Sequence, residues 1–250
     1  MSEDYVPLSR RSSAQLRAEA QNYRRMAATA RMADTENSLL KLAIRFDALA
    51  ELLPLQEEAG NDPAIEGKLG HLFLVASSPS RAADVYHALI QQDPKDAEAY
   101  AGLGEAELEQ GRYREAKAAF ITALTHKPND APLRERMQLA NTMTALDPTP
   151  RQIRSVEKYQ RGLRILELSR ASLEKCVATR PNLSSNEADE LLKAAQEVLS
   201  RKTPSHVTNE LAEETLGLAE KMWQARIKMC GASTSAEQEA LRLIMDRLAR

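Results

Sequence analysis

A 34-residue period is the feature that most restricts what this 250-residue chain can fold into. Segment 97–130 carries small, apolar and turn-forming residues at fixed positions, and segment 63–96 repeats several of them in the same register. The matched pairs are Ala82 with Ala116, Tyr86 with Phe120, and Pro94 with Pro128. Periods of this length are typical of helical repeats, in which each unit buries its apolar face only against its neighbours. The period therefore predicts stacked pairs of helices.

The residue types within 97–130 fit two crossing helices. Gly104 and Ala116 are small, so the two helices can approach closely. Gly111 can adopt the positive φ that ends the first helix, and Pro128 ends the second. The full set of patterned residues is Tyr100, Leu103, Gly104, Gly111, Tyr113, Ala116, Phe120, Ala123 and Pro128.

This pattern resembles the tetratricopeptide repeat (TPR) family, whose repeat reads Trp-x2-Leu-Gly-x2-Tyr, then Ala-x3-Phe, then Pro. Tyr100 replaces the tryptophan, and Glu107 stands at the tyrosine position. Segment 63–96 has serines and a proline where 97–130 has its turn glycine, and segment 131–148 lacks the Leu-Gly pair. We interpret 131–148 as a degenerate repeat or a capping helix.

The flanking segments are expected to be helical and to pack on the repeats, because a solenoid needs about three units plus caps. Segment 12–53 predicts an antiparallel hairpin with Asp34 as the N-cap of its second helix, followed by a linker at 54–63. Its seam residues are Leu16, Ala20, Tyr23, Ala27 and Ala30, then Leu39, Leu42, Phe46, Leu49 and Leu53. After Pro150, segments 151–179, 187–201, 207–229 and 236–249 predict a four-helix bundle.

The predicted fold class is therefore all-α, a short TPR solenoid between a helical hairpin and a helical bundle. The expected domains are a hairpin and linker at 1–62, repeats at 63–148 (units 63–96, 97–130 and 131–148), and a bundle at 149–250. The stretch 147–176 resembles extensions that follow TPRs in some bacterial proteins, which implies a bacterial source.

Composition excludes several function classes. A net charge of -2 gives no general attraction to nucleic acid or anionic lipid. The sequence has no uninterrupted run of about 18 apolar residues, so we predict no membrane-spanning helix. Its acidic start is not followed by an apolar segment, so we predict no secretory signal. We therefore expect a cytoplasmic location.

The sequence offers no arrangement typical of catalysis. It contains no GxGxxG, GxxxxGK[ST], HExxH or GxSxG motif, and its four histidines are scattered. Cys176 and Cys230 have no zinc-type spacing. We expect no enzyme activity, no metal and no cofactor. Two buried, reduced thiols are the favoured interpretation of the cysteines, and a disulfide between two helix ends is the alternative.

The resemblance to the TPR family implies a groove lined by the first helices, which binds peptides or partner segments. The implied positions are Glu98, Ala101, Gly102, Glu105, Leu108 and Glu109 in one unit, and Ala64, Gly67, Lys68, His71, Leu74 and Val75 in the other. Of these, the predicted partner-binding residues are Lys68, His71, Glu98, Ala101, Gly102, Glu105, Leu108 and Glu109.

The groove's residue types suggest what it would bind. Small residues at 67, 101 and 102 leave room for a partner, and the three glutamates favour partners that carry Lys or Arg. The alternative is that the glutamates only solubilise the face. Family members that clamp a C-terminal carboxylate use Lys, Arg and Asn at the positions of Ala101, Gly102 and Glu105, so that binding mode is not expected.

The first helix carries a second charge pattern. Arg10, Arg17, Arg24 and Arg31 recur every seven residues. A basic edge for RNA, DNA or an acidic protein is one interpretation. We prefer the other, in which the arginine stems cover the helix interface and their heads reach Asp47 or Glu51.

The preferred functional hypothesis is a non-catalytic adaptor or assembly factor that holds a peptide or helix of another protein in the groove. The first alternative is a homo-oligomeric scaffold that self-associates through the seams at 16–53 or 207–248. The second is a regulatory subunit associated with an enzyme. Neither membrane nor nucleic acid is an expected partner.

Overall fold

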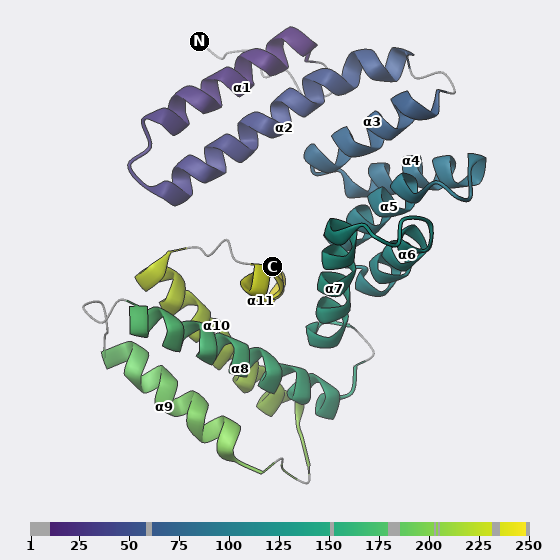
Figure 1. Cartoon of the computed structure of the whole chain (residues 1–250). Coiled ribbons are helices and arrows are strands. Elements are labelled where there is room, and N and C mark those ends of the chain that lie inside the picture. The colour runs from purple at the N-terminus through teal and green to yellow at the C-terminus, as the bar shows by residue number, and fades with distance from the viewer. Residues whose placement is uncertain are drawn as a thin grey trace. The chain divides into compact units, whose positions relative to one another are not determined.

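The computed structural model describes residues 11–58, 62–150, 153–179, 186–202, 204, 206–231 and 236–248. All regular elements in these residues are α-helices (Figure 1), as the sequence predicts. They are α1 (Ser13–Ala28), α2 (Ala33–Glu58), α3 (Pro63–Val75), α4 (Pro79–Gln92), α5 (Ala97–Glu109), α6 (Tyr113–His126), α7 (Ala131–Leu146), α8 (Ser155–Thr179), α9 (Asn186–Ser200), α10 (Asn209–Cys230) and α11 (Ala236–Leu248). The chain forms two compact units, Met1–Ala140 and Asn141–Arg250.

The 34-residue period reappears in the turns inside the two repeats. The backbone N–H of Ser77 bonds to the carbonyl of Leu74 at 2.8 Å, and that of Gly111 bonds to the carbonyl of Leu108 at 3.0 Å. Ser77 has φ 56° and Gly111 has φ 73°. The serine therefore adopts the left-handed conformation that glycine adopts one repeat later, although that region disfavours a side chain.

The same interval separates the residues that begin the first helix of each unit. Asp62, Asp96 and Asp130 precede α3, α5 and α7. Each carboxylate accepts a hydrogen bond at 2.8–3.0 Å from a backbone N–H in the following first turn. Since Asp130 repeats this cap, the third unit starts like the others even though it lacks the Leu-Gly pair.

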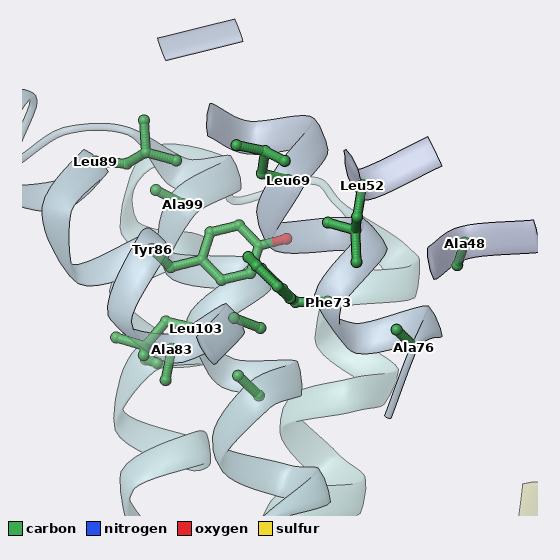
Figure 2. Close-up of a cluster of buried hydrophobic side chains, with 13 residues drawn as sticks. Ala48, Leu52, Leu69, Phe73, Ala76, Ala83, Tyr86, Leu89, Ala99 and Leu103 are labelled. Atoms are coloured by element: carbon green, nitrogen blue, oxygen red, sulfur yellow. The ribbon is translucent and has the colours of Figure 1, made fainter. Parts of the chain in front are cut away.

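The core of the repeats forms where large rings of the second helices meet glycines of the first. Phe120 on α6 is fully buried, and a Cβ atom added to Gly104 would lie 2.5 Å from its ring. The neighbouring cluster joins α2 to α6 around Phe73 and Tyr86 (Figure 2). Its other labelled members are Ala48, Leu52, Leu69, Ala76, Ala83, Leu89, Ala99 and Leu103.

The predicted N-terminal hairpin is present, and its α1 side is as expected except for Ala30, which lies beyond the end of α1 at Ala28. Leu16, Ala20 and Ala27 are buried, and the rings of Tyr23 and Phe46 lie 5.2 Å apart. The prediction for α2 is partly wrong. The fully buried positions of α2 are Ala43, Ala48, Ala50 and Leu52, while Leu53 is 38% exposed. Because α2 packs on both α1 and α3, its buried residues spread over two faces.

The ends of α2 also differ from the prediction. The helix begins at Ala33, so Asp34 lies in its first turn and is not its N-cap. It continues through Pro54 to Glu58, where a linker was expected. Proline removes one backbone hydrogen bond from a helix. Here Leu52 and Leu55 on either side pack into the repeat core, which offsets that loss.

The second unit contains four helices in its described part after α7, and two of them run parallel. The Ser155 hydroxyl donates to Asn209 at 2.7 Å, and Cys176 forms a disulfide with Cys230. Both pairs are 54 residues apart, so α8 and α10 keep one register from end to end. The favoured prediction of two reduced thiols is wrong, because this parallel packing brings both helix C-termini together.

Candidate binding groove

Two adjoining cavities open on the first helices of the repeats. The larger, about 640 Å³, lies between α2, α3 and α5. The smaller, about 320 Å³, lies between α3, α5 and α7. Both are lined by His71, Tyr86 and Glu98. We call the combined surface the repeat groove.

The repeat groove contains most of the residues expected from the sequence. It is lined by Lys68, His71, Glu98, Ala101, Gly102 and Glu105, and also by Ala64, Gly67 and Leu74. Val75, Leu108 and Glu109 line neither cavity. Leu108 is only 6% exposed and belongs to the packed interior, so its assignment to the groove is wrong.

The small residues of the groove have two different roles. A Cβ atom added to Gly67 would meet no atom within 4 Å, so the groove is open there. A Cβ atom added to Gly102 would lie 2.1 Å from the Tyr86 ring. The room expected at Gly102 is therefore filled by the protein's own side chain.

The groove is less acidic than the sequence suggests. Lys127 donates to Glu98 at 2.8 Å, and Nε of Arg136 donates to Glu105 at 2.6 Å. Two of the three predicted glutamates are thus neutralised within the chain. Spacing along the first helices could not show this, because both cations follow the second helix of the unit.

Sequence analysis missed many other lining residues, and three of them stand out. Glu51 reaches the groove from α2 and forms no ion pair with a described residue, and Asp96 caps α5. Tyr86 lines both cavities from α4. A tyrosine at the position that Phe120 holds one repeat later is a sequence signal that could have marked it.

Glu109 lines neither cavity, but its ionisation is coupled to the charges of Glu105 and Arg136, which line the groove. Burial raises the pKa of Glu109, the Glu105 carboxylate raises it further, and Arg136 opposes the rise. The charged carboxylate therefore destabilises the folded state above the ordinary pKa of 4.5 and has no such effect below it.

We expect Glu109→Gln to raise the thermal unfolding midpoint at pH 7, because it removes this unfavourable charge. The gain should shrink as the pH falls through the carboxyl range and vanish near pH 3.5, where Glu109 is protonated in both states. Circular dichroism melts over this pH series test the expectation. A gain that is the same at pH 7 and pH 3.5 would contradict it.

Chemistry of other kinds finds little support in the described part of the chain. There, no three His, Cys, Asp or Glu residues gather in a way that could hold a metal ion. Among the helices of the described residues, none combines the length and hydropathy that crossing a bilayer requires. On α1, Arg24 pairs with Asp47, as the preferred interpretation of the arginines expects, whereas Glu51 pairs with no arginine that the structure describes.

Comparison with known proteins identifies the repeats. Residues 76–138 match the family model of the tetratricopeptide repeat. The match covers α4 to α6 and the first half of α7. Together with the all-α fold, it supports the interpretation that the chain is a TPR protein. Such repeats generally mediate protein–protein interactions and are typically non-catalytic. No curated protein and no solved structure matches the chain.

Proposed function

We propose that this chain binds a segment of another protein in the repeat groove and serves, without catalysis, as an adaptor or assembly factor. The observation that carries the proposal is the continuity of the two cavities through His71, Tyr86 and Glu98. An extended or helical segment needs such a continuous surface, whereas a small molecule needs one enclosed pocket.

The charge of the groove favours a basic segment. The lining includes five carboxylates, Glu51, Asp96, Glu98, Glu105 and Asp130, and three cations, Lys68, Lys127 and Arg136. Glu51, which pairs with no described residue, and the cap Asp96 lie in the larger cavity. Lysine or arginine of a partner would be attracted there, mainly through a faster association rate.

We expect Gly67→Trp to weaken the binding of a groove partner at least tenfold. The indole would project into the larger cavity, which Gly67 lines, and its Cβ atom would meet no atom within 4 Å. Replacing a helical glycine also removes a residue with poor helix propensity. Binding is measured by fluorescence anisotropy with labelled basic peptides selected on the full-length chain from a displayed random library.

The matched control is Gly217→Trp on α10, since a Cβ atom at Gly217 also meets no atom within 4 Å. This variant should bind the selected peptides like the wild type. The proposed function fails if no peptide binds the wild type, or if all selected peptides bind Gly67→Trp with unchanged affinity.

Light scattering separates this function from the homo-oligomeric scaffold. If the groove binds a basic segment of another protein, the wild type and Gly67→Trp should have the same mass at all concentrations. A dimer that forms in the wild type and is lost in Gly67→Trp would make a second copy the occupant of the groove.

A further inference from the structure

The ring of Tyr86 crosses from its own helix to the floor of the repeat groove. A Cβ atom added to Gly70 on α3 would lie 2.8 Å from Cζ of Tyr86, and one added to Gly102 on α5 would lie 2.1 Å from it. The carbon that bears the hydroxyl thus lies between the two first helices. Figure 2 shows the ring extending from α4 with its oxygen at the far end.

The Tyr86 hydroxyl has no hydrogen-bond partner among the described residues, while the rest of the side chain is packed and the residue as a whole is 6% exposed. The oxygen is not among the buried polar atoms that lack a partner, so it is accessible from the cavities, where water pairs with it until a bound segment displaces that water. Because Tyr86 lines both cavities, a segment bound in the groove can reach its hydroxyl.

Packing alone does not require this hydroxyl. Phe120 holds the equivalent position 34 residues later, is fully buried and packs on Gly104 in the same way. A phenyl ring would therefore satisfy the stacking of α4 on α3 and α5. The oxygen of Tyr86 is an addition that the fold does not use.

We propose that the Tyr86 hydroxyl donates a hydrogen bond to a main-chain carbonyl of the basic segment bound in the repeat groove, an assignment that rests on the proposed function. Gly67 presents no side chain to the groove and has open space around its Cα, so the backbone of a partner can approach the floor closely there. Burial, with a smaller effect of Glu105, raises the pKa of Tyr86 to about 12, so the hydroxyl keeps its proton at neutral pH.

The test is Tyr86→Phe in the full-length chain. The probes are the selected basic peptides whose binding Gly67→Trp weakens. We expect the affinity to fall about tenfold, because the partner's carbonyl is left unpaired, while the thermal midpoint stays equal or rises. Tyr100→Phe is the matched control, since Tyr100 lines neither cavity, and its affinity should not change.

A second arm locates the carbonyl. Each amide bond of the best peptide is replaced in turn by an ester, whose carbonyl is a weaker acceptor. At one position the ester should weaken binding to the wild type but not to Tyr86→Phe. The inference is overturned if Tyr86→Phe binds like the wild type, if no position shows this coupling, or if Tyr86→Phe lowers the midpoint. If Tyr86→Phe binds like the wild type, the proposed function still stands. The proposed function and this inference both fail only if no peptide binds the wild type or if all selected peptides bind Gly67→Trp with unchanged affinity.

Discussion

Reduction of the Cys176–Cys230 disulfide is expected to lower the free energy of unfolding of the unit Asn141–Arg250 by about 4 kcal/mol. The bond closes a loop of 54 residues, and a cross-link of that length removes much conformational entropy from the unfolded chain. It also holds the C-terminal ends of α8 and α10 together. Denaturant unfolding with and without reductant measures the effect.

The single tryptophan of the chain makes this measurement specific. Trp223 lies on α10, is 6% exposed and has Arg226 over its ring at 5.5 Å, so its fluorescence reports on the second unit. The double variant Cys176→Ala, Cys230→Ala should unfold at the lower denaturant concentration and be insensitive to reductant. Equal midpoints for oxidised and reduced wild type would contradict the expectation.

The disulfide also bears on where the protein works. Stable disulfides are typical of oxidising compartments and rare in the cytosol. The cytoplasmic location expected from the sequence stays a prediction, and the disulfide argues for an oxidising compartment instead. Alkylation of protein taken directly from its native cells decides between them, since only reduced thiols are labelled.

Phe120→Ala is expected to destabilise the unit Met1–Ala140 by about 4 kcal/mol, because it removes a fully buried ring and leaves a cavity beside Gly104. This unit contains no tryptophan. Amide hydrogen exchange of α5 and α6 therefore gives the readout, and protection of both helices should fall together.

Ile121→Ala is the control on the same helix. Ile121 is 45% exposed, so its truncation should cost less than about 1 kcal/mol. If Phe120→Ala changed amide protection no more than Ile121→Ala does, the stacking of the repeats would not depend on the ring-on-glycine contacts.

The repeating elements can be predicted from the residue pattern, because their signals are local. Gly111 ends a helix through its own φ, and Asp96 caps the helix that follows it. Apolar spacing likewise placed the helices of both flanks within a few residues of their observed ends. These features need only neighbours within one or two turns of the chain.

The contents of the groove, by contrast, depend on how the helices stack on one another. Tyr86 fills the space at Gly102, Arg136 neutralises Glu105, and α2 supplies Glu51 as part of a wall. The pairing of Cys176 with Cys230 likewise follows from the shared register of α8 and α10. Each of these contacts joins residues on different helices, and their meeting depends on how helices stack, which periodicity along one helix does not encode.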